Sequence, residues 1–232
     1  MNAMVDQSQR IAARVAAVSY PLTLLVSILA YNRLYVPLQI WGDPAATVRN
    51  IAAHEPTFRL YLAALLAYGV GVVVVLTALY VVLRSVSRGL ALFAMLCRLV
   101  YAVMWFVQLL DLFGALRAAG GAGDLAGLQL ASGRDAYYVG LGFYGLGTVV
   151  LGCLWHQSRY VPRLLAAWGV ASSIFMGGCG FAYVLFPGFG AIVSVNWYEL
   201  PVALFELGIS ICILARGLRP PEFSSPPLPL AP

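Results

Sequence analysis

Six long apolar segments, separated by shorter polar ones, make up most of this 232-residue chain. Each approaches or exceeds the roughly 20 residues that a helix needs to cross the hydrocarbon core of a bilayer. We predict membrane-spanning helices over residues 15–31, 57–83, 89–115, 135–155, 163–186 and 197–215. The predicted fold is all-α, a polytopic integral membrane protein with six transmembrane helices in one bundle over residues 1–218. A disordered, proline-rich cytoplasmic tail is predicted over residues 219–232.

The segments between the predicted spans differ in length. The first, over residues 32–56, contains Asp43-Pro44, which predicts a helix start with Asp43 as N-cap, a short helix over residues 45–54 and an end at Pro56. Residues 116–134 are rich in Gly and Ala and are predicted to form a loop, with at most one helical turn over residues 125–130. The remaining connections are short turns.

The composition places the chain in a bilayer, since 62% of the residues are hydrophobic and 10% are charged. A soluble domain is about half apolar and about a quarter charged. The basic residues are all Arg and form no clustered face, which argues against a nucleic-acid partner. The four cysteines lie far apart in apolar segments, so no metal site, redox pair or cofactor is predicted.

Six spans place both ends of the chain on one side of the membrane, and the Arg distribution predicts which side. Eight Arg lie on the side of the termini: Arg10, Arg14, Arg84, Arg88, Arg159, Arg163, Arg216 and Arg219. Five lie on the other side: Arg33, Arg49, Arg59, Arg117 and Arg134. Because cytoplasmic loops collect basic residues, this bias favours both termini in the cytoplasm.

The third predicted span carries polar side chains in an otherwise apolar helix. Steps of three and four residues connect them: Arg98, Tyr101, Trp105, Gln108 and Asp111. This spacing predicts one side of an α-helix. A helix in lipid needs polar partners for such a stripe, so the other helices are expected to surround it.

Glu206 is a further charged residue in an apolar segment, because it lies midway along the sixth span. Arg98 lies nine residues after Gly89, and Glu206 nine before Ala215, so their depths from the cytoplasmic side match. We predict that Arg98 and Glu206 face each other. The pair could be a structural bridge between two helices or part of a functional site.

Asp111 and Glu199 lie toward the outer ends of their spans. They are either solvated at the interface or, with Gln108 and Tyr101, line an outward-facing polar cavity. Tyr144 belongs to a dense set of aromatic residues, which either pack the bundle or line a pocket for a hydrophobic ligand.

A glycine pattern in the fourth span, Gly140-x-Gly142-x-x-Gly145, matches a dinucleotide-binding fingerprint. No strand precedes it and it lies inside an apolar helix, so the nucleotide interpretation is rejected. These glycines, like the cluster over residues 177–180, are expected to let helices approach closely, although that cluster could also form a local break.

Two segments carry a resemblance to a known family. The first is Gly42-Asp43 with Thr47, Asn50-Ile51, Glu55 and Phe58-Arg59, and the second is the turn Ser-Arg-Tyr-Val-Pro-Arg over residues 158–163. Over about residues 13–218 the chain resembles the bacterial membrane family called domain of unknown function 4386. The resemblance implies six spans in the bacterial inner (cytoplasmic) membrane and no established activity.

Three functions are compatible with these residues. The first is a binding or sensing module whose buried polar and aromatic pocket holds a lipid-soluble molecule, with Arg98, Tyr101, Trp105, Gln108, Tyr144 and Glu199 as ligand-binding residues. The second is an intramembrane enzyme that cyclises or isomerises a prenyl or terpenoid substrate, with Glu206 or Asp111 as the acid. The third is a small-solute or proton-coupled transporter with Arg98, Glu206 and Asp111 as a relay.

Overall fold

The computed structural model describes residues 6–121, 123–186 and 188–218. The regular elements of these residues are all helical, and six helices are long and apolar enough to cross a membrane. The elements are α1 (Gln7–Ala30), η1 (Tyr31–Tyr35), η2 (Val36–Leu38), α2 (Pro44–Ala53), α3 (Glu55–Leu83), α4 (Arg88–Ala118), α5 (Gly123–Ser158), α6 (Arg163–Leu185), α7 (Phe189–Ile192) and α8 (Val195–Arg216). The predicted all-α bundle of six spans is confirmed, whereas the predicted tail over residues 219–232 lies outside the described residues.

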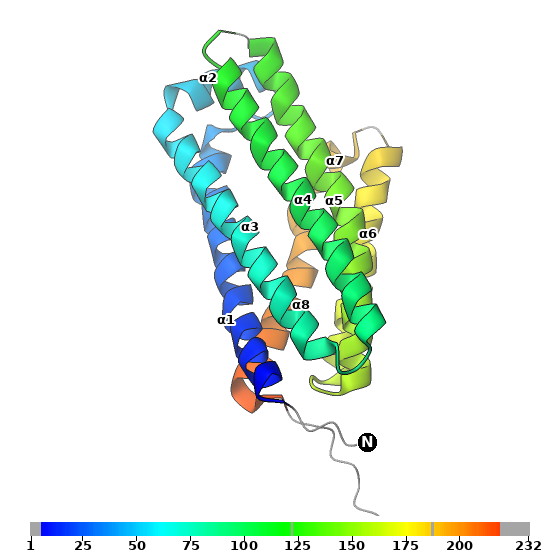
Figure 1. The fold of residues 1–232 in the computed structure, drawn as a ribbon. Helices are drawn as coiled ribbons and strands as arrows, with labels where there is room; N and C mark the ends of the chain where they lie inside the picture. Colours follow the sequence, from blue (N-terminus) through cyan, green and yellow to red (C-terminus); the bar gives the residue numbers. More distant parts are fainter. Residues whose placement is uncertain (1–5, 122, 187, 219–232) are drawn as a thin grey trace, which may run out of the picture.

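The six long helices form a closed ring in chain order. Each packs against the next, from α1 through α3, α4, α5 and α6 to α8, and α8 returns to α1 (Figure 1). The side chains on the inner faces therefore meet along the axis of the ring. Residues from helices on opposite sides can contact each other there, and this arrangement builds the candidate site.

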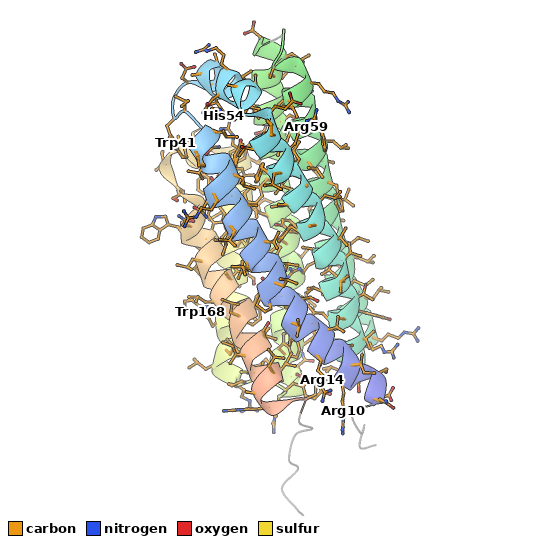
Figure 2. The ribbon with its side chains drawn as sticks, turned by 90° about the vertical axis from the view of Figure 1, so that its left-hand side faces the viewer. Arg10, Arg14, Trp41, His54, Arg59 and Trp168 are labelled. Atoms are coloured by element: carbon orange, nitrogen blue, oxygen red, sulfur yellow. The ribbon has the colours of Figure 1, made fainter. Side chains whose placement is uncertain are left out.

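The two ends of the bundle are distinguished by their polar side chains. Arg10 and Arg14 lie at the end where α1 begins and α8 finishes, and His54 and Arg59 lie at the opposite end (Figure 2). The first and last long helices thus share one end, as six crossings require. That this end faces the cytoplasm stays a prediction.

The membrane-facing surface of the ring is apolar. On α3, Leu66, Val70 and Val74 are each more than two-fifths exposed, and on α4 Leu110 is 69% exposed. A soluble monomer rarely exposes a continuous surface of this kind, whereas lipid tails solvate it well. The outer surface and the span lengths together make this a multi-pass membrane protein.

The loop predicted over residues 116–134 is wrong for most of its length. The helix α4 continues to Ala118, and α5 already begins at Gly123. Small residues there serve close packing: a Cβ on Gly133 would lie 3.3 Å from the Asp111 Cβ of α4. The 36 residues of α5 span about 54 Å, so this helix extends well beyond a hydrocarbon core of about 30 Å.

The first predicted loop is partly confirmed. The Asp43 carboxylate accepts a hydrogen bond from the Ala46 N–H at 2.8 Å and caps α2 as predicted. Pro56, however, occupies the first turn of α3 instead of ending α2, a position where its missing N–H costs nothing. The first span also continues beyond its predicted end through η1 and η2, where the Tyr35 ring stacks on Tyr61 with centroids 4.8 Å apart.

The glycines of α5 and α6 bring these two helices into close contact, as predicted. A Cβ on Gly145 would lie 2.6 Å from the Gly177 Cα and 2.7 Å from the Ser173 carbonyl oxygen. A Cβ on Gly180 would lie 2.9 Å from the Tyr138 carbonyl oxygen. The fingerprint-like glycines are therefore helix-packing positions inside α5, and α6 runs through residues 177–180 without a break.

Candidate functional site

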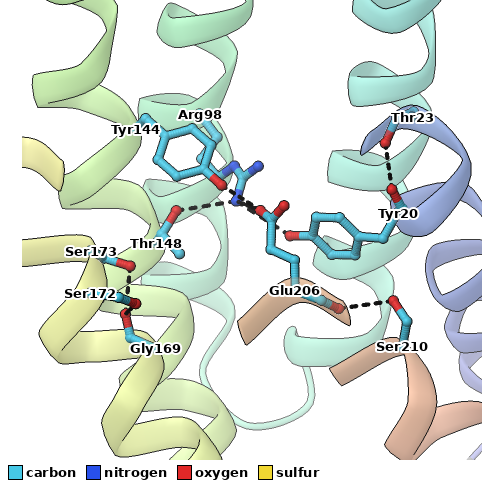
Figure 3. Close-up of polar contacts among 10 residues, drawn as sticks. All are labelled: Tyr20, Thr23, Arg98, Tyr144, Thr148, Gly169, Ser172, Ser173, Glu206 and Ser210. Carbon is cyan, nitrogen blue, oxygen red and sulfur yellow. Dashed lines mark hydrogen bonds and ion pairs between the residues drawn. The ribbon is translucent and has the colours of Figure 1, made fainter. Parts of the chain in front are cut away.

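The Arg98 and Glu206 side chains meet in the interior of the ring, reaching across it from α4 and α8 (Figure 3). The Nη1 atom of Arg98 lies 3.1 Å from Oε1 of Glu206. The two residues are only 3% and 8% exposed. The predicted pairing is confirmed, and the two opposite charges neutralise each other inside the bundle, where a lone charge would be costly.

Three further side chains complete a polar cluster around this pair. Arg98 Nη1 also donates to the Thr148 hydroxyl at 3.1 Å and to the Tyr20 hydroxyl at 3.3 Å. The Tyr144 hydroxyl donates to the same Glu206 oxygen that Arg98 contacts. The guanidinium carbon of Arg98 also lies 4.1 Å from the Tyr144 ring centroid, within cation–π distance. Four helices thus contribute to one cluster: α1, α4, α5 and α8.

Hydrogen-bonding capacity in this cluster remains unused. All described contacts of Arg98 come from Nη1, which has only two hydrogens for three acceptors. Its buried Nε finds no partner among the described residues, and Nη2 makes no hydrogen bond to them. Within the same residues, Glu206 accepts only through Oε1, which leaves Oε2 available. The pair therefore offers both a free donor and a free acceptor.

A small cavity adjoins the pair and gives this capacity somewhere to act. Its volume is about 20 Å³, enough for one water-sized group. Its walls come from α1 and α3, with the ion pair on the far side: Tyr20, Thr23, Leu24, Tyr68, Val72, Val75, Arg98 and Glu206. The cavity is thus lined by both apolar and hydroxyl-bearing side chains of α1 and α3 and by the two charged side chains.

Local sequence features place the cluster residues. Gly147 on α5 makes room for the Arg98 stem, since a Cβ there would lie 2.8 Å from Arg98 Cγ. Tyr144 and Thr148 are four residues apart, so they share the inner face of α5. Pro21 follows Tyr20 inside α1 and removes one helical hydrogen bond at this level.

Two other predicted site residues, Tyr101 and Trp105, lie next to the cluster. Glu199 lies further from it, toward the end of the bundle near His54. The Tyr101 ring packs edge-on against Tyr144 with centroids 4.9 Å apart. The Trp105 indole N–H donates to the Leu65 carbonyl at 3.3 Å. Glu199, two turns from Glu206 on α8, accepts a hydrogen bond from the Tyr137 hydroxyl at 2.5 Å. These residues line the interior between the ion pair and the end near His54.

Gln108 and Asp111 do not join the cluster. Asp111 accepts from the Ser132 hydroxyl at 2.9 Å, and both residues pack against Gly133 where α4 meets α5. The reason is geometric. Each step of three residues turns the helix by about 300°, which is about 60° short of a full turn. Side chains placed at repeated steps of three therefore rotate around the helix and away from the axis of the ring. The structure therefore brings Arg98, Glu206, Tyr144, Tyr101 and Trp105 together and separates Asp111 from them.

The sequence did not assign roles to Tyr20, Tyr68 and Gly147. A Tyr in an apolar helix does not stand out in the sequence, because its ring packs well in lipid or protein and costs little free energy to bury. Only the position of Tyr20 beside Pro21 was a possible signal. Within the described residues, no group of three or more His, Cys, Asp or Glu could hold a metal ion.

Three comparisons with known proteins were informative to different degrees. The model of a family described as a domain of unknown function (DUF4386) matches residues 15–217, which is well over half of the chain. The searches of curated proteins and of solved structures gave no match. The chain therefore belongs to the DUF4386 family.

Proposed function

We propose that this DUF4386 member is an intramembrane binding module that holds a lipid-soluble small molecule at the Arg98–Glu206 cluster. The observation that supports the proposal is the unused donor and acceptor of a buried ion pair beside a cavity. A bridge that only joins helices is most stabilising when all its polar groups have partners. This pair leaves Nη2 of Arg98 and Oε2 of Glu206 without protein partners among the described residues, which favours a ligand.

The helix α1 provides the most accessible wall of the cavity. In the most apolar stretch of the first span, Gln7–Leu38, 28% of the residues are buried, compared with 39% or more in the other five spans. Pro21 interrupts its hydrogen bonding beside Tyr20, which makes local bending easier. A molecule dissolved in the bilayer would have to pass between α1 and α3, which line the cavity and are in close contact at Thr23 and Gly71.

Two features of the cluster favour binding over acid catalysis. Glu206 accepts hydrogen bonds from both Arg98 and Tyr144, so its described contacts use this side chain as an acceptor. The other candidate acid, Asp111, lies at the α4–α5 contact away from the cavity. This separation also interrupts the relay that a proton-coupled transporter would need.

A disulfide across the proposed route tests the function. A Cβ on Gly71 would lie 3.6 Å from the Thr23 Cβ, within the usual disulfide range of about 3.5–4.5 Å. The double variant Thr23→Cys/Gly71→Cys should therefore join α1 to α3 on oxidation. Native mass spectrometry of the reduced protein should detect a bound apolar molecule that exchanges with added lipid, and oxidation should stop that exchange.

The single variants Thr23→Cys and Gly71→Cys are the matched controls, because neither can form this disulfide. Exchange that continues in the fully oxidised double variant would show that the molecule does not pass between α1 and α3. A folded wild-type protein that carries no apolar molecule, and takes up none from mixed lipids, would contradict the binding function itself.

A further inference from the structure

We infer that the head group of the ligand is an uncharged primary hydroxyl at the end of an unbranched chain. The inference rests on the proposed binding function and names its ligand class. It follows from three properties of the cavity: its net charge, its free hydrogen-bonding groups and its size.

The charge of the cavity excludes an ionised head group. Arg98 and Glu206 neutralise each other, and the other described residues that line the cavity are uncharged. A carboxylate or phosphate would compete with Glu206 for Arg98, and an ammonium group would compete with Arg98 for Glu206. Either would leave an unpaired charge inside the membrane, which is costly.

The hydrogen-bonding groups require a head that both accepts and donates. The Nη2 group of Arg98 makes no hydrogen bond to the described residues, and Oε2 of Glu206 accepts none from them. A ketone or ester could accept from Arg98 but could donate nothing to Glu206. A hydroxyl is the smallest group that satisfies both, and the Tyr20 and Tyr68 side chains in the same lining add further polar contacts.

The size of the cavity restricts the head group of the ligand to a small cross-section. A volume of about 20 Å³ holds one water-sized group, which a terminal CH₂–OH approaches after a small movement of the walls. A sterol or quinone ring would have to separate α1 from α3 along several residues. Leu24, Val72 and Val75 provide an apolar wall that suits the first methylenes of the chain.

A matched series of C16 compounds tests this inference on the full-length protein in detergent. A photoactivatable diazirine derivative of hexadecan-1-ol is cross-linked to the protein, and labelled peptides are mapped by mass spectrometry. Unlabelled hexadecan-1-ol, hexadecanoic acid, hexadecylamine, hexadecane and a sterol then compete. Peptides from α1 and α3 should be labelled, and the alcohol should compete at least about tenfold better than every other compound, a difference of about 1.4 kcal/mol.

The variant Glu206→Gln adds a readout that a purely structural role would not change. Removing the carboxylate leaves Arg98 unpaired, so the preference should shift from the alcohol toward hexadecanoic acid by about tenfold or more. If this variant does not fold, the wild-type series alone decides. A wild type that binds the acid or the amine as well as the alcohol overturns the inference while the binding function stands. If no compound protects α1 and α3 from labelling, the binding function fails as well.

Discussion

The buried Arg98–Glu206 pair leads to a quantitative prediction. Arg98→Met leaves the Glu206 carboxylate with one hydrogen bond, from Tyr144, so the loss in free energy of unfolding should approach about 5 kcal/mol. Glu206→Leu leaves a cation that keeps two hydroxyl acceptors and the face of the Tyr144 ring, so its loss should be smaller, about 3 kcal/mol. The double variant should lie within about 2 kcal/mol of the wild type, because two apolar side chains then fill the same space.

The measurement is reversible unfolding in mixed micelles, with the four proteins compared as a double-mutant cycle. The exposed pair Glu55–Arg59 is the matched control. Its N–O distance of 2.6 Å is shorter than the 3.1 Å of the buried pair, yet the Glu55 and Arg59 side chains are 48% and 59% exposed. Its coupling energy should therefore be only about 0.3–0.5 kcal/mol. If the Arg98→Met and Glu206→Leu losses simply add, the two residues do not stabilise each other and the cluster is misunderstood.

Three other predictions address topology, helix packing and the limits of the site. Reporter fusions after Arg88 and after Arg216 should both read cytoplasmic, and a periplasmic signal at either position would contradict the Arg bias. Gly145→Ala should lower the free energy of unfolding by about 1–3 kcal/mol through the α5–α6 contact. Gly178→Ala should cost nothing, because no atom lies within 4 Å of the Cβ that it adds. Equal losses would refute the packing argument. Asp111→Asn should leave binding of the C16 alcohol unchanged, and a large loss of affinity would place Asp111 in the site.

The sequence predicted those parts of the fold that carry a strong free-energy signal. Apolar segments long enough to cross a bilayer located all six spans, and the cost of a charge in lipid singled out Arg98 and Glu206. Counting residues from the turns then matched their depths, because a helix rises by a fixed distance per residue. The pairing across the ring could thus be predicted without knowledge of which helices are neighbours.

Other features lacked such a signal. Gly- and Ala-rich residues before Asp135 resemble a loop in composition, but in α5 they allow the close approach of α4. Tyr20 and Thr148 are inexpensive to bury anywhere in a helical bundle, so nothing in the sequence joined them to Arg98. The stripe through Gln108 and Asp111 was misleading because steps of three residues hide a slow rotation of the helix face.

The predicted stability of the double variant also bears on function. If Arg98→Met/Glu206→Leu folds as well as the wild type, the bundle does not need this ion pair to hold α4 and α8 in place. An apolar axis would then fold equally well and would have no unused N–H groups or carboxylate oxygen beside the cavity. What the variant would lose is the ability to offer a donor and an acceptor together in the middle of the membrane. Loss of the C16 alcohol from a stable double variant would therefore assign the pair to binding, whereas retention of the alcohol would assign it to neither role.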